Sequence, residues 1–165
     1  RSIGNSAFEG CSALLNVNLS DSVTEVGCMA FLSCPSLQSP IYNSHLFARL
    51  PETYSGIYTM PAGIQQITCG AFSYSFHLTS VVMPQSLRAI GGNAFEKCTM
   101  LDTITIPSKV NRLDPWLFQE CEMLSRVTLP DSINNIALGL FYHCSNLRTK
   151  SMSQSEYFSC FHSNI

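Results

Sequence analysis

Residues 90–107 read IGGNAFEKCTMLDTITIP, and this stretch returns along the chain with a period of 23 residues. Its central phenylalanine recurs at Phe8 and Phe31, and then at Phe72, Phe95, Phe118 and Phe141. An aliphatic residue stands five positions before each Phe and a leucine six positions after it, as Ile90 and Leu101 do around Phe95. Self-similarity at a fixed period of this length predicts a solenoid, in which each unit buries its apolar face only by stacking on its neighbours.

Each unit contains two segments of different periodicity. Ile104-Thr105-Ile106 alternates apolar and polar residues, which predicts a short strand, and Pro107 ends it because proline has no N–H to donate to a neighbouring strand. The segment 94–101 has the spacing of a helical or 3₁₀ turn but is too short for a stable free helix. Glycine four positions before Phe, at Gly4, Gly27 and Gly91, is expected to permit a tight backbone bend.

The unit resembles the leucine-rich repeats of the BspA-like family, a subclass from bacterial and protist surface proteins with about 23 residues per repeat. The resemblance covers the chain from Ile3 to Leu147. It implies an α/β fold, namely a right-handed leucine-rich repeat solenoid with short parallel strands on one face and short helical or 3₁₀ turns on the other. We expect the solenoid over residues 1–149, with six clear repeats and one degenerate unit around 43–61. Residues 150–165 are expected to form an irregular C-terminal cap or tail.

The period fails once, between Phe31 and Phe72. These residues are 41 positions apart, so a shortened unit of 18 residues is expected between them. Arg49 stands where the register predicts Phe, and Tyr58-Thr59-Met60-Pro61 continues the strand column one period before residues 81–84. Two interpretations stay open for this segment. It is either a tolerated irregularity or a protruding binding feature, since insertions in repeat proteins often map to one functional face.

The chain has eight cysteines in 165 residues. Five share the column three positions after Phe, at Cys11, Cys34, Cys98, Cys121 and Cys144, and Ser75 holds the same place in the remaining unit. A buried cysteine packs as a small hydrophobe, and a serine could not replace one half of a framework disulfide. We therefore expect a ladder of free thiols, although neighbouring rungs lie near enough to bond. Cys28 and Cys69 share a different column, and Cys160 is expected to be exposed in the tail.

Composition excludes several classes of protein. Charged residues make up 12% and hydrophobic residues 45%, the opposite of a disordered chain. The formal net charge of −2 argues against a protein built to bind nucleic acid or an anionic membrane. No run approaches the roughly 18 apolar residues of a transmembrane helix. The repeat pattern is already under way at Arg1, so we expect a fragment of a longer protein.

Catalytic and metal-binding motifs do not emerge from the sequence. There is no phosphate-binding loop, no dinucleotide fingerprint and no zinc-like cysteine spacing, and Cys160-Phe161-His162 is at most a weak pair of ligands. Cys69 with His77, and Cys144 with His143, are the conceivable nucleophile–base pairs, and neither lies in a supporting motif. The sequence therefore predicts no enzyme, no cofactor and no metal, with a cysteine hydrolase as the hypothesis to be excluded.

Alternate strand residues point away from the core and offer a nearly uncharged surface. The candidate binding face consists of Asn16, Asn18, Ser80, Val82, Thr103, Thr105, Arg126 and Thr128. Arg126 is its only charge, and Val82 together with Ile41 supplies its large aliphatic side chains. Exposed threonines also suit a strand for its own sake, so the pattern alone does not separate a binding role from strand propensity.

The resemblance implies a non-enzymatic binding module of a cell-surface or secreted protein that acts in adhesion or host interaction. Its expected partner is a protein or glycan, with host extracellular matrix among the candidates, and neither nucleic acid nor a membrane is expected. An intracellular scaffold or adaptor built from the same repeats is the alternative, and reduced thiols would suit it.

Overall fold

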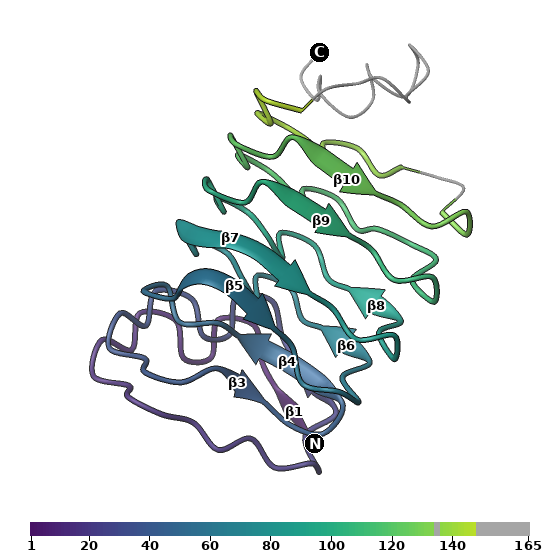
Figure 1. Ribbon diagram of the computed structural model, residues 1–165. Helices are drawn as coiled ribbons and strands as arrows, with labels where there is room; N and C mark the ends of the chain where they lie inside the picture. The colour runs from purple at the N-terminus through teal and green to yellow at the C-terminus, as the bar shows by residue number, and fades with distance from the viewer. Residues whose placement is uncertain (134–135, 148–165) are drawn as a thin grey trace.

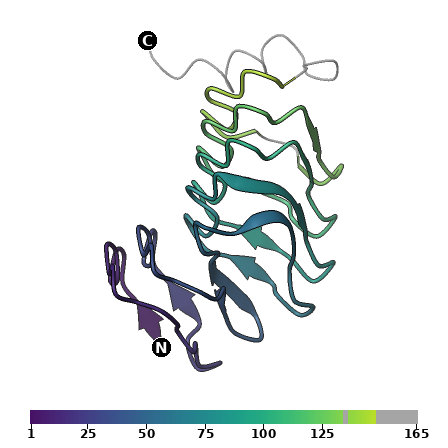
Figure 2. The ribbon, with the colours of Figure 1, turned by 60° about the vertical axis from the view of Figure 1, so that its left-hand side comes forward.

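The computed structural model of the chain describes residues 1–133 and 136–147, and the expected cap or tail, with Cys160, lies outside them. The chain winds in successive coils that stack along one axis, from the N-terminal coils toward strand β10 (Arg126–Thr128) (Figures 1 and 2). Segments 23 residues apart lie side by side, as the Thr103–Arg126 strand pair shows. The described residues form a solenoid, as the repeat predicts.

One face of the solenoid is a parallel sheet of four strands in the order β10-β9-β7-β5. The strands are β5 (Ser55–Thr59), β7 (His77–Val82), β9 (Thr103–Thr105) and β10 (Arg126–Thr128). They coincide with the predicted strand column, displaced by about one residue toward the N-terminus. Tyr58 pairs with Val81 and Thr59 with Val82, so the strand register predicted for the degenerate unit is confirmed.

A second set of short strands lies mostly at the aliphatic position five residues before Phe, and the region of the shortened unit adds two strands to it. Here β1 (Ser2–Ile3) pairs with β2 (Glu25–Val26), and a separate sheet has the order β3-β4-β6-β8. Its strands are β3 (Ile41–Tyr42), β4 (Leu46–Arg49), β6 (Gln66–Ile67) and β8 (Ala89–Ile90). β3 and β4 form an antiparallel hairpin, whereas β4, β6 and β8 pair in parallel. Figure 1 shows β6 and β8 behind the four-stranded sheet. The sequence identified these positions as core residues but did not predict that they pair as strands.

The Ala-Phe segments are chains of tight turns, and the described residues contain no α-helix or 3₁₀-helix. The expected helical turns are therefore wrong. The cause is a left-handed residue two positions before each Phe and another two positions after it, which interrupts any helical run. Before Phe these residues are Ser6, Met29, Gly70, Asn93, Trp116 and Gly139; after Phe they are Gly10, Ser33, Tyr74, Lys97, Glu120 and His143.

Two of the glycines four positions before Phe serve coil packing rather than a bend, whereas a Cβ atom on the third, Gly4 in the first coil, would meet nothing within 4 Å. Gly27 and Gly91 do not have the positive φ that favours glycine. A Cβ atom on Gly27 would collide with the backbone N of Asn5, and one on Gly91 would collide with the backbone N of Cys69. The absence of a side chain therefore lets successive coils approach each other, which corrects the expectation of a tight bend at these sites.

Stacked phenylalanines run through the core. Phe72 lies 4.8 Å from Phe95 between ring centroids, and Phe95 lies 5.5 Å from Phe118, with nearly parallel planes. Beside them the predicted thiol ladder is confirmed, since Cys11, Cys34, Cys98, Cys121 and Cys144 are all free. The thiols of Cys34, Cys98, Cys121 and Cys144 each donate to the Phe carbonyl of the preceding coil, at 3.0–3.1 Å. Ser75 is also buried in this column but has no such acceptor.

The thiol ladder should resist alkylation in the folded protein. Burial raises the pKa of Cys98 and Cys121 well above the usual range, and raises the pKa of Cys144 to about 12. Because the thiolate is the nucleophile, iodoacetamide at pH 8 should leave these three residues unmodified until denaturant is added. Mass spectrometry of tryptic peptides measures this directly. Labelling of all three at the same rate with and without denaturant would contradict the buried ladder.

The shortened unit departs from the predicted register at its Phe position. Phe47, rather than residue 49, extends the ring stack, with its centroid 4.8 Å from that of Phe72. Arg49 is buried instead, and its guanidinium donates to the Gly70 carbonyl at 2.7 Å and to the Glu52 carboxylate at 2.6 Å. Burial lowers the pKa of Arg49, and the Glu52 charge opposes that shift.

The irregular residues after β3 are tied to the preceding coil. The Asn43 side-chain amide donates to the carbonyls of Ser20 and Val23, and its carbonyl oxygen accepts from the N–H groups of His45 and Leu46. These four bonds use the whole amide group of a buried side chain. The segment packs on the solenoid, and this geometry favours a tolerated irregularity over a protruding feature.

Candidate binding face

The outward side of the four-stranded sheet presents two columns of side chains. Paired residues place Ile57, Ser80, Thr103 and Arg126 in one column, and Thr59, Val82, Thr105 and Thr128 in the other. The alternate residues point inward, where Val81 and Ile104 are buried in the core. The pleat of the strands therefore fixes which side chains reach the solvent.

Hydroxyl groups and two exposed aliphatic side chains give this face its chemistry. Ile57 is 62% exposed and Val82 is 52% exposed. An open hollow of about 320 Å³ lies beside Val82, and its lining includes Ser80, Thr103, Thr105 and Pro107. Threonine and serine hydroxyls both donate and accept hydrogen bonds. The hollow can therefore receive a neutral group with its own donors and acceptors, placed against an apolar wall.

Arg126 is the only Arg, Lys, Asp or Glu in the four strands. Binding at this face therefore removes water from few strongly hydrated charged groups of the protein. The main free-energy cost of burying the face is the desolvation of its hydroxyl groups, which have to find hydrogen-bond partners in the ligand.

Six of the eight predicted face residues lie on this sheet: Ser80, Val82, Thr103, Thr105, Arg126 and Thr128. Asn16 and Asn18 are exposed in the first coil but belong to no strand, and the side-chain Oδ1 of Asn16 accepts a hydrogen bond from the Ser39 hydroxyl. The placement of Ile41 on the face is wrong, because β3 buries this side chain completely. The sequence also missed Ile57 and Thr59, which the alignment of Tyr58 with Val81 would have revealed.

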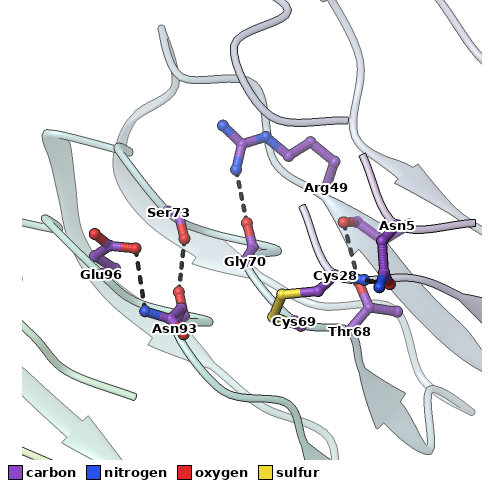
Figure 3. The surroundings of a disulfide bond; sticks show 10 residues. Asn5, Cys28, Arg49, Thr68, Cys69, Gly70, Ser73, Asn93 and Glu96 are labelled. Carbon is purple, nitrogen blue, oxygen red and sulfur yellow. Dashed lines mark hydrogen bonds between the residues drawn. A yellow bond between two sulfur atoms is a disulfide. The ribbon is translucent and has the colours of Figure 1, made fainter. Parts of the chain in front are cut away.

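The geometry opposes both conceivable nucleophiles. Cys69 is joined to Cys28 in a disulfide, so it has no free thiolate (Figure 3). Cys144 is buried, donates to the Phe118 carbonyl and has a raised pKa, so it stays protonated. Within residues 1–133 and 136–147, no three His, Cys, Asp or Glu residues come together as metal ligands. In the same ranges there is no helix long and apolar enough to span a membrane.

The repeat matches a known family along almost the whole chain. The family described as BspA type leucine rich repeat region, with six copies, matches residues 1–57 and 43–163. A search of the curated proteins gave no match.

Several solved structures share the fold. A leucine rich cell surface protein from Faecalibacterium prausnitzii is 24% identical with a TM-score of 0.63, over 99% of this chain and 55% of that protein. The leucine-rich repeat protein of T. pallidum is 26% identical with a TM-score of 0.55, over 90% and 72%. A leucine-rich repeat protein from Bacteroides ovatus is 32% identical with a TM-score of 0.58, over 88% and 33%. The chain thus spans about half of the F. prausnitzii protein and a third of the B. ovatus protein.

Proposed function

Because the chain belongs to the BspA-type leucine-rich repeat family, we propose that it is a non-enzymatic binding module of a cell-surface or secreted protein. Its outward sheet face, as defined by the two columns above, holds the partner. The observation that carries this proposal is that the face combines the exposed side chains of Ile57 and Val82 with several serine and threonine hydroxyl groups and a single charged residue, Arg126. Solenoids of this kind use such extended faces to bind macromolecules.

The Cys28–Cys69 disulfide supports an oxidising location. Structural disulfides persist outside the cytoplasm and are rare inside it. The free thiols do not favour the intracellular scaffold, because four of the five described ones are buried and need no reducing environment to stay unpaired. The F. prausnitzii relative is a cell surface protein, which agrees with the same location for this chain.

We further propose adhesion to host matrix as the biological role, with a protein or a glycan as the ligand. Both classes offer neutral amide or hydroxyl groups that match the serines and threonines of the hollow beside Val82. A protein partner is favoured, because exposed aliphatic side chains give most of their binding energy to apolar contacts.

A single charge placed in the middle of the face should weaken binding strongly. The wild-type chain is applied to arrays of extracellular-matrix proteins and glycans, together with Val82→Arg and a matched control, Ala89→Arg in β8 on the opposite side. Val82→Arg should weaken every specific signal at least tenfold, since charge is depleted at the centre of binding surfaces. Ala89→Arg should bind as the wild type does. Equal binding by all three chains would refute the proposal that this face binds the partner.

A further inference from the structure

The solenoid holds two apolar cores that meet at β4. The N-terminal core includes Phe31, Ile41, Leu46 and Ala48, whereas Phe47 and Leu50 belong to the C-terminal core. All four residues of β4 are buried. Its alternating side chains therefore face one core and then the other. The ring stack is interrupted at the same place, because Phe31 stacks on Phe8, whereas the second stack joins Tyr42, Phe47 and Phe72.

Fewer direct bonds join the coils at this junction than elsewhere. Between the Phe72 and Phe95 coils, three N–H groups, of Gly70, Phe72 and Tyr74, donate to the carbonyls of the next coil. Between the Phe31 and Phe72 coils only the first of these bonds remains, from Met29 to Cys69.

Residues 50 and 52 replace the other two bonds. The Leu50 N–H donates to the Ala71 carbonyl, and the Glu52 carboxylate accepts from the Ser33 N–H at 3.0 Å. The shortened unit thus lies between the Phe31 and Phe72 coils at the positions of the second and third bonds. It is absent at the position of the first bond, where Met29 contacts Cys69 directly.

That absence brings Cys28 and Cys69 together. The two residues share a repeat column but are 41 positions apart, so a full unit would have separated them. Because the shortened unit contributes no residue to this column, their coils abut directly, with a Cα–Cα distance of 4.6 Å. This is the spacing of neighbouring strands, about 4.8 Å. Figure 3 shows the disulfide next to the Arg49–Gly70 hydrogen bond, where the two cores meet.

We propose that the Cys28–Cys69 disulfide is a redox-released clasp that holds the coils of residues 1–37 against the rest of the solenoid. A dithiol reductant opens it by two thiol–disulfide exchanges. A reductant thiolate attacks one sulfur and displaces the other as a thiolate, which takes up a proton. The second thiol of the reductant then resolves the mixed disulfide. The products are two cysteine thiols and the oxidised, cyclic disulfide of the reductant.

The two parts differ in how firmly they are held. The C-terminal core runs without interruption from Phe47 to Cys144. The N-terminal core is smaller, and its first coil leaves Phe8 41% exposed and Leu15 50% exposed. Both clasp cysteines are partly exposed, so a reductant can reach the bond. Reduction therefore lets residues 1–37 separate from the rest of the solenoid, with the β3–β4 hairpin as the hinge. The outward sheet face stays in place.

Hydrogen exchange read by mass spectrometry tests the clasp in the whole chain. Four samples are compared: the oxidised protein, the protein with a dithiol reductant, and the Cys28→Ser/Cys69→Ser double variant without and with that reductant. In the reduced protein, protection of the amides of Met29 and Ser33 and of residues 1–37 should fall about 100-fold or more, as expected when a cross-link across this loop length is lost. Residues 66–133 should keep their protection.

The double variant should resemble the reduced protein, and the reductant should change nothing further in it. Loss of protection along the whole chain would make the disulfide a general staple and overturn the clasp. Unchanged protection at residues 1–37 would also overturn it. So would an intact mass showing Cys28 and Cys69 as free thiols in the untreated protein. If the double variant does not fold, the reduced wild type gives the same comparison.

Discussion

Replacing Phe95 by alanine should lower the free energy of unfolding by about 3–5 kcal/mol. Phe95 is completely buried, and its ring lies between those of Phe72 and Phe118 in the continuous stack. Removing it costs the transfer free energy of the ring and leaves a cavity between two rigid coils. The coils cannot close on that cavity, because Phe72 and Phe118 are themselves held by backbone hydrogen bonds to their neighbours.

Phe8→Ala is the matched control for this cavity. Phe8 occupies the same repeat position, but it is 41% exposed at the end of the shorter stack. Its removal should cost less than half as much, because water already reaches the ring. Urea denaturation followed by circular dichroism measures both changes. If the two variants lose equal stability, or if Phe95→Ala unfolds as the wild type does, the stacking register is wrong.

Glu52→Ala should lower the free energy of unfolding by about 3 kcal/mol. The Arg49 side chain is 2% exposed, and Glu52 is its single ion-pair partner among the described residues. The substitution leaves a buried charge with the Gly70 carbonyl as its remaining acceptor, and it also frees the Ser33 N–H. This loss is at the lower end of the range for broken buried ion pairs, because Glu52 itself is partly exposed. Water can therefore reach the space that its side chain leaves beside Arg49.

The double variant Arg49→Met/Glu52→Ala separates the charge effect from a packing effect. Methionine retains the apolar stem and removes the unpaired charge, so the double variant should be more stable than Glu52→Ala alone. Denaturation midpoints of the wild type, both single variants and the double variant complete the cycle. Strictly additive losses would show that the two side chains do not depend on each other.

The repeat predicted the parts of the fold that recur at a fixed spacing. Phe95, Leu101 and Cys98 were placed in the core because side chains in one column face the same neighbours in every coil. The left-handed residues escaped prediction, since Met29, Lys97 and Trp116 carry side chains and do not signal a positive φ as Gly70 does. When those residues are not recognised, the spacing of the apolar residues in this segment resembles that of a helix.

The shortened unit shows the limit of reasoning from a period. An 18-residue interval says that five residues are missing but does not say which columns lose them. Arg49 was therefore placed at the Phe position, whereas the ring that extends the stack comes from Phe47, whose backbone pairs with Ile67. For the same reason Cys28 and Cys69 were assigned to one column without being recognised as neighbours.

The candidate face was predicted where strands form. Thr103, Thr105 and Thr128 follow from the alternation of each strand, and the sheet places them outward. Ile41 was misplaced because Pro40 and the β3–β4 hairpin end the regular coil before the outward position is reached. Tertiary pairing, rather than the alternation of the sequence, decides the direction of such a residue.

Photo-crosslinking from two positions of one chain tests the binding face most directly, and it does not require a known ligand. A benzoyl-phenylalanine is placed at Thr105 on the outward sheet or at Ala89 on the opposite side, where both native residues are exposed. Each chain is irradiated on an extracellular-matrix preparation, and the adducts are identified by mass spectrometry. A specific adduct from Thr105 and none from Ala89 is the expected result. Adducts from Ala89 alone, or from both positions equally, would contradict the proposed face.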